Sequence, residues 1–109
     1  MAYDEKLAER VRKRLHGYKG LTERKMFGVV GFMLRGNMCC GVLGEHLILR
    51  VSREQGESIL NLAHTKAFDV FGVVKKGMVM VLPAGVESDK QLEAWLEYGV
   101  RYALTLRPK

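Results

Sequence analysis

The most reactive side chains in this sequence are two adjacent cysteines, Cys39 and Cys40, and three separate histidines, His16, His46 and His64. Neighbouring residues on a strand point to opposite faces of a sheet, so a disulfide between the two cysteines would be strained. No residue stands at a spacing typical of a metal site or of a catalytic Cys–His pair. We therefore interpret the cysteines as reduced, semi-buried thiols. We predict no catalytic activity, no metal site and no cofactor.

Two glycines, Gly28 and Gly31, invite comparison with a phosphate-binding loop. Such a loop requires glycines in a strand-to-helix turn, often followed by lysine and a hydroxyl residue. Here the glycines precede an apolar strand pattern, and no Gly-Lys-Ser/Thr motif follows. We therefore predict a β-bulge or a tight strand crossing at this point.

Basic side chains form the remaining candidate site. The chain carries 18 Lys and Arg against 12 Asp and Glu, a net charge of +6, and its first 25 residues hold eight bases and four acids. Helical spacing places four of the bases on one stripe, and a basic pair precedes an aromatic residue further on. Such a surface attracts nucleic acid or an acidic partner, or is simply solvated. The candidate contact residues are Lys6, Arg10, Lys13, Arg14, Arg24, Lys25 and Phe27.

The elements that position these residues follow from apolar spacing and turn signals. An amphipathic helix is predicted over 4–17, with Asp4 as its N-cap. Two-residue turns are expected at Gly36-Asn37 and Gly44-Glu45. The three strands that they join are predicted at 25–35, 38–43 and 46–51. This register aligns Met33, Cys40 and Leu49, and it makes both faces of the sheet substantially apolar.

The second half of the chain is predicted by the same signals. Ser52 and Ser88 each stand three residues before a glutamine, which is the capping-box spacing at the start of a helix. Thr65 to Val70 is interpreted as connecting chain. The predicted elements are a helix at about 53–63, strands at 71–75 and 78–82 with a turn at Lys76-Gly77, and a helix at about 89–106.

These predictions give one α+β domain over residues 1–109, a two-layer α-β(3)-α-β(2)-α fold with a mainly antiparallel five-stranded sheet. No apolar run approaches the ~18 residues that span a bilayer, and the N-terminus lacks a signal-peptide core, so we expect a cytoplasmic protein without membrane contact. The methionines are core filler or an adaptable partner surface. If the helices cover only one apolar face of the sheet, a second copy of the chain covers the other, and a homodimer is expected.

Two independent groups of residues carry a family resemblance. The first group is Arg24-Lys25-Met26-Phe27-Gly28-x-x-Gly31-Phe32-Met33, Gly36-Asn37-Met38 and Leu49-Arg50-Val51. The second is Leu92-x-x-Trp95-Leu96-Glu97-x-Gly99-x-x-x-Ala103-x-x-Leu106-x-Pro108, preceded by Lys76-Gly77 and Pro83-x-Gly85. With these residues the chain resembles the N-terminal domain of the TfoX/Sxy family over nearly its whole length. Departures from the family pattern are Val29, Cys39-Cys40 and Val73-Val74-Lys75, which stand where Gly, Phe-Ala and Arg-Pro-Met are common.

The resemblance implies the two-layer fold given above and no catalytic residue. Two-domain members of the family regulate natural competence genes, together with the cyclic-AMP receptor protein at promoters. We expect this chain to be a stand-alone N-terminal domain. The resemblance therefore implies a non-enzymatic regulatory module that binds a protein, with a transcription-related protein as the candidate partner. Direct nucleic-acid binding through the basic face of the first helix is the alternative.

Overall fold

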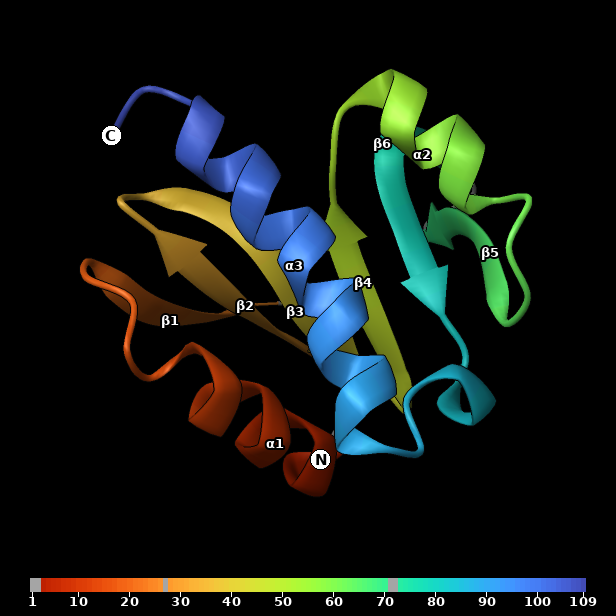
Figure 1. Cartoon of the computed structure of the whole chain (residues 1–109), viewed down its shortest axis with the longest axis horizontal. Helices are drawn as coiled ribbons and strands as arrows, with labels where there is room; N and C mark the ends of the chain where they lie inside the picture. The colour runs from red at the N-terminus through yellow and green to blue at the C-terminus, as the bar shows by residue number, and fades with distance from the viewer. Residues whose placement is uncertain (1–2, 27, 71–72) are drawn as a thin grey trace.

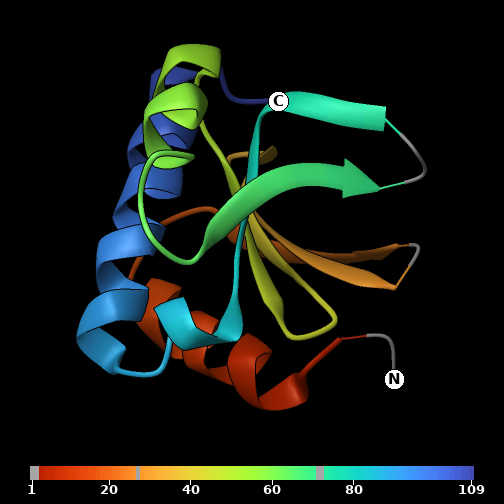
Figure 2. The same cartoon turned by 90° about the vertical axis from the view of Figure 1, so that its right-hand side faces the viewer.

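The structure is a computed structural model that describes residues 3–26, 28–70 and 73–109. Within these residues, three α-helices lie on one side of a six-stranded antiparallel sheet (Figures 1 and 2). The helices are α1 (Glu5–Leu15), α2 (Arg53–Ile59) and α3 (Asp89–Thr105), with a 3₁₀ turn at Pro83–Gly85. The strands are β1 (Leu21–Met26), β2 (Val29–Leu34), β3 (Asn37–Leu43), β4 (His46–Arg50), β5 (Thr65–Val70) and β6 (Val73–Val81).

The helix starts agree with the predicted caps. The Asp4 carboxylate accepts from the backbone N–H groups of Lys6 and Leu7. Ser88 and Gln91 form the predicted capping box of α3, whereas Ser52 caps α2 only by accepting from the backbone N–H of Gln55. The helix α2 ends at Ile59, earlier than predicted. The Thr65 hydroxyl donates to the carbonyl oxygens of Ile59 (3.1 Å) and Leu62 (2.9 Å), and these bonds hold the turn that leads into β5.

The sheet has six strands in the order β1-β2-β3-β4-β6-β5, so the prediction of five strands was wrong. The residues before Phe27 form a separate strand, β1, and Gly28 lies in the turn after it with a φ of +78°. This turn, not the predicted bulge or crossing, explains Gly28. The segment Thr65–Val70 is a strand rather than connecting chain, and 73–81 is one strand rather than two. The prediction for residues 71–72 lies outside the described residues.

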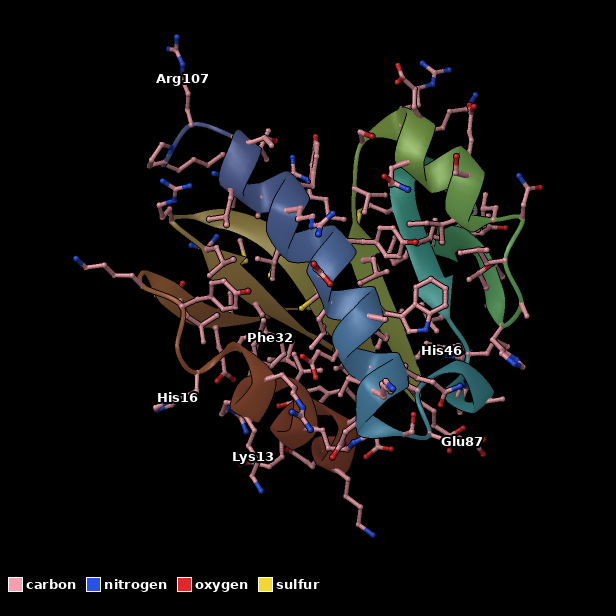
Figure 3. The ribbon with its side chains drawn as sticks, viewed as in Figure 1. Lys13, His16, Phe32, His46, Glu87 and Arg107 are labelled. Carbon is pink, nitrogen blue, oxygen red and sulfur yellow. The ribbon has the colours of Figure 1, made fainter. Side chains whose placement is uncertain are left out.

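The hairpin between β2 and β3 turns one residue earlier than predicted. Its turn residues are Arg35 and Gly36, with φ values of +52° and +85°, and Leu34 pairs with Asn37. Positive φ at both central residues is the type I′ geometry that matches strand twist. The shift exchanges the faces of β2, so that Phe32, labelled in Figure 3, belongs to the core under the helices. Met33 is not part of that core and lies on the opposite face of the strand. The predicted turn at Gly44-Glu45 is confirmed, because Leu43 pairs with His46.

A β-bulge follows from this shift and places both cysteines on the core side. The pairing changes register between Phe32 and Met33, so that Met33 faces Met38 while Phe32 faces Cys40. The extra residue in β3 is Cys39, which is buried like Cys40. The prediction that the two cysteines point to opposite faces was therefore wrong. A bulge interrupts the simple alternation of a strand.

The main hydrophobic core fills the space between the helices and the sheet. It joins α1 (Leu7, Val11) and α3 (Leu92, Leu96) to inward residues of the strands. The closest approach is at Gly99 of α3, where an added Cβ would lie 2.1 Å from the Cys39 carbonyl oxygen. The helix α3 therefore rests directly on the bulged backbone of β3, because Gly99 has no side chain to keep the two apart.

Candidate functional site

The predicted basic stripe lies on α1, but the structure neutralises half of it. Arg14 lies 2.9 Å from a carboxylate oxygen of Asp89, and Arg10 lies 3.5 Å from the other oxygen of the same carboxylate at the start of α3. Lys6 and Lys13 are exposed, and Lys13 extends away from the body of the molecule (Figure 3). The ion pairs hold α1 against α3, which reduces the positive charge that this face offers to a nucleic acid.

The basic pair on β1 does not extend this stripe as one surface. Arg24 pairs with Gly31, and Lys25 pairs with Val30, so their side chains leave the strand on opposite faces. The ammonium of Lys25 lies 6.0 Å from the centre of the Tyr3 ring on the helix side. Phe27, the predicted aromatic contact, lies outside the described residues.

A bidentate ion pair that the sequence analysis did not foresee joins α1 to β1. The guanidinium of Arg12 donates to both carboxylate oxygens of Glu23, at 2.6 and 2.8 Å, and also to Glu9. The hydrogen bonds from Arg12 lower the pKa of Glu23 below its ordinary value. This pair anchors the edge strand β1 to the helix layer. We interpret this ion pair as structural, because the guanidinium of Arg12 and the carboxylate of Glu23 neutralise each other.

The two thiols are free and inaccessible. Both cysteines are 0% exposed, and their sulfur atoms are 3.7 Å apart. The hydrogen bond with Cys39, together with burial, raises the pKa of the Cys40 thiol well above its ordinary value. A thiol that is buried away from solvent is a poor nucleophile and a poor metal ligand. The cysteines therefore act as packing residues in the described structure.

The histidines do not meet in a common site. His16 and His64 are exposed, His46 is half-buried on β4, and Figure 3 shows His16 and His46 at separate places. Among the residues that the structure describes, no three His, Cys, Asp or Glu side chains lie close enough to hold a metal ion. Two open hollows of about 390 and 380 Å³ flank α3 on the helix side. Neither contains a histidine or a cysteine.

The second candidate surface is the side of the sheet that the helices leave uncovered (Figure 2). We call it the outer face. Its residues alternate with the core residues along the strands and include six that pair across all six strands in one continuous row. This row, in sheet order, is Arg24, Gly31, Gly41, Ile48, Met80 and Lys66. Two further methionines of the outer face, Met33 and Met38, form the neighbouring pair of β2 and β3.

The outer face is apolar at its centre and basic at both ends of the row. Ile48 and Met80 are 0% and 5% exposed, although neither belongs to the main core. The glycines Gly31 and Gly41 face each other, and the Met38 methyl lies near both: a Cβ added at Gly41 would lie 2.9 Å from that methyl carbon, and one at Gly31 3.9 Å. Methionine side chains therefore cover the glycines at the centre of the outer face.

This row does not follow from the predicted elements, because the predicted register of β2 and β3 differs from the one in the structure. With a turn at Gly36-Asn37, Gly31 would not have faced Gly41. One signal was available, since a glycine inside an apolar strand often marks a place where another group approaches the backbone closely. Both Gly31 and Gly41 are of this kind, and each is followed by an apolar residue on the core side, Phe32 and Val42.

Comparison with known proteins identifies the domain. The family model described as the TfoX N-terminal domain matches residues 13–103, which include all six strands and most of α3. A search among curated proteins found no match to the chain. In the described residues, no helix is both long and apolar enough to cross a membrane.

Proposed function

The chain belongs to the TfoX N-terminal domain family, and we propose that it is a non-enzymatic regulatory module that binds another protein. The proposed partner is a transcription-related protein, and the proposed location is the cytoplasm. The family is a regulatory domain family that is not known for enzymatic activity. The observation that carries the proposal is the outer face of the sheet, where half-buried Met33 and Met38 lie over paired glycines. Methionine side chains are unbranched and adaptable, and they are common at protein-binding surfaces.

Capture from native cytosol with matched variants tests this function. The test variant is Met33→Lys with Met38→Lys, which adds charge to the outer face. A lysine stem can lie over the glycines while its amine reaches solvent, so we expect the fold to survive. The control is Leu104→Lys, at an exposed apolar residue of α3 that is 44% accessible.

A partner retained by the wild type and the control, and lost with the test variant, is the expected result. Circular dichroism of all three proteins checks the fold. Retention by all three would place the interaction elsewhere and contradict the role of the outer face. If no protein is retained by the wild type, the proposed function is wrong.

The homodimer expected from the sequence is another way to cover the outer face, and sedimentation velocity tests it. A dimer through this face would dissociate in the Met33→Lys, Met38→Lys variant but not in the Leu104→Lys control. A wild-type chain that sediments as a monomer at tens of micromolar would end this proposal.

Direct nucleic-acid binding is the second candidate, and the net charge of +6 is the observation in its favour. The exposed bases Lys6, Lys13 and Arg24 would contact phosphates. Arg10 and Arg14 contribute less, because Asp89 already pairs with both. The geometry therefore supports protein binding better than nucleic-acid binding.

A further inference from the structure

The hollow between α2 and α3 is lined by accessible aromatic side chains, and we call it the α2–α3 hollow. Its volume is about 380 Å³, within the range of about 300–1,000 Å³ that is common for binding clefts. Tyr98 and Tyr102 line it from α3, and Ser52 and Gln55 line it from the start of α2 (Figure 1). Both tyrosines are half-buried and Gln55 is exposed, so a ligand can reach these side chains in the single chain.

The aromatic side chains beside the α2–α3 hollow are concentrated and held in place. The chain has four tyrosines and one tryptophan, and three of these five residues, Trp95, Tyr98 and Tyr102, share one side of α3 through their spacing of three and four. The Trp95 indole donates to the Gly85 carbonyl oxygen at 2.9 Å, and the Tyr98 ring lies 6.0 Å from the Trp95 ring. The Arg50 guanidinium lies 5.7 Å from the centre of the Tyr102 ring. Rings that are already restrained lose little freedom when a ligand binds.

The lining of the α2–α3 hollow offers hydrogen-bond donors. The hydroxyls of Tyr98, Tyr102 and Ser52, the Gln55 amide and the Arg101 guanidinium can each donate, and none of the described residues that line the hollow is acidic. A proline-rich segment has the complementary pattern, because proline has a carbonyl oxygen but no N–H. Its polyproline II helix has no internal hydrogen bonds, so the carbonyl oxygens stay available. Such segments bind aromatic-lined grooves in other domains.

The charge around the hollow favours an acid in the occupant. Arg101 is the one charged side chain among the described lining residues, and its exposed ion pair with Glu97 contributes little to stability. Arg50, beside Tyr102, takes part in none of the ion pairs that the described residues form. A carboxylate bound here would therefore meet positive charge.

A single-stranded nucleic acid is the other occupant that stacks on aromatic rings and pairs with arginines. The two helices beside the hollow oppose it, because α2 and α3 together carry five acids and three bases. A run of phosphates would be repelled by these acids, whereas a peptide with few carboxylates would not. The observations therefore favour a peptide.

We propose that the α2–α3 hollow binds a proline-rich segment of a partner protein, with proline rings against Tyr98 and Tyr102 and a carboxylate toward Arg50 and Arg101. This hollow lies on the helix side of the sheet. The inference therefore adds a second binding surface to the proposed function and does not depend on the outer face.

The test uses the full chain labelled with ¹³C in its tyrosine rings and three synthetic peptides. The first peptide has about nine residues, three turns of polyproline II helix, with glutamates placed between prolines. The second has alanine in place of every proline, and the third has lysine in place of every glutamate. Fluorescence anisotropy gives the affinities, and the tyrosine spectra locate the contact. Tyr3 and Tyr18, which do not line the hollow, are internal references.

Matched variants separate a specific site from general attraction. The variant Tyr102→Leu removes the ring and its hydroxyl, and the control Tyr18→Leu makes the same change at a tyrosine that is 41% exposed elsewhere. We expect the first peptide to bind the control as tightly as the wild type and to bind Tyr102→Leu about tenfold more weakly, because tyrosines often supply much of the binding energy of an interface. Its affinity for Arg101→Gln should fall about threefold relative to Lys90→Gln, which makes the same change in charge on α3. Circular dichroism checks the fold of each variant.

Equal affinities of Tyr102→Leu and Tyr18→Leu for the first peptide, or binding of the alanine peptide as tight as that of the first, would overturn the inference. Preference for the lysine peptide, or no binding by the first peptide, would do the same. A single-stranded oligonucleotide that shifts the Tyr98 and Tyr102 signals while the first peptide does not would assign the hollow to nucleic acid instead.

The outcome is distinguishable from that of the proposed function. The Met33→Lys, Met38→Lys variant should bind the first peptide as the wild type does, because the outer face is not part of the α2–α3 hollow. If a cytosolic partner is captured through Met33 and Met38 while the first peptide does not bind, the proposed function stands and only this inference fails.

Discussion

Gly99 is the residue on which the packing of α3 against the sheet depends. A side chain at this position would meet backbone atoms of Cys39, and backbone cannot move aside as the end of a flexible side chain can. The pair of buried thiols beneath it is therefore held in place from both sides, by α3 and by the Phe32 carbonyl oxygen, 3.3 Å from the Cys39 sulfur.

The substitution Gly99→Ala should destabilise the fold. The added methyl group must push α3 away from β3, and overpacking of this kind costs about 2 kcal/mol even after the better helix propensity of alanine is counted. Urea unfolding followed by circular dichroism measures the change. The control is Gly17→Ala, where an added Cβ meets nothing within 4 Å and which should leave the midpoint unchanged. Equal midpoints for wild type and Gly99→Ala would show that α3 does not rest on Cys39 as described.

At the scale of elements, the ion pair between Arg12 and Glu23 is what fastens the first edge strand to α1. Both side chains are about one-third exposed, so solvent screens part of the attraction. The pair is bidentate, which is the strongest arrangement for a guanidinium and a carboxylate. It links residues that are close in the chain but belong to different layers of the fold.

The variant Glu23→Gln should be less stable than the wild type at neutral pH, by about 0.5–1 kcal/mol. The folded-state pKa of Glu23 is lowered, so its stabilisation is present above the ordinary carboxyl pKa of about 4.3 and is lost as the pH falls through the folded value. Urea unfolding at pH 7 and near pH 3 should therefore show a difference between the two proteins that shrinks with acid. The control Glu57→Gln, at an exposed residue of α2, should change stability at neither pH. A difference that grows toward low pH would contradict the pairing.

The sequence was sufficient for the elements whose signals are local. Caps at Asp4, Ser52 and Ser88 placed the starts of the helices, and Gly44 placed one hairpin. The two missed strands, β1 and β5, are the two edges of the sheet. Edge strands pair on one side only and carry charged residues that prevent further pairing, so Thr22–Lys25 and Lys66 showed no apolar alternation.

The candidate sites were less predictable, because they depend on how elements meet. Helical spacing placed Arg10 and Arg14 on one stripe, but only the packing of α1 on α3 brings Asp89 against them. The outer face depends on a one-residue shift of the β2–β3 turn, which moves every side chain of β2 to the other side. Short-range signals favoured Gly36-Asn37, since a glycine at the first central position suits a two-residue turn, whereas Arg35 must adopt a φ of +52° that few residues other than glycine adopt.

At the scale of the whole molecule, the positive charge is spread over several surfaces. Lys13 extends from α1, Arg24 and Lys66 lie at the ends of the outer face, and Lys25 leaves β1 on the helix side. A charge of +6 spread over several surfaces in this way produces a general attraction for polyanions.

Nucleic-acid binding should therefore be weak and should involve few phosphates. In a filter-binding titration of duplex DNA, we expect the logarithm of affinity to fall with the logarithm of salt at a slope of about −2 to −3, which corresponds to two or three neutralised phosphates. Lys13→Glu should weaken the binding no more than Lys66→Glu. A slope near −5 or steeper, with a selective loss for Lys13→Glu, would instead favour the basic face of α1 as a true nucleic-acid interface.

The order of the strands also has a consequence for the path by which the chain folds. Each of β1 to β4 pairs with its neighbour in the sequence, whereas β6 passes beyond β5 to pair with β4 across α2. Local hairpins close quickly, and pairings that enclose a long loop form more slowly because more chain entropy is lost. The meander of the first four strands is therefore expected to form early, and the hairpin of β5 and β6 to join it late. The six-stranded sheet, and with it the row on the outer face, would then be complete only after that last step.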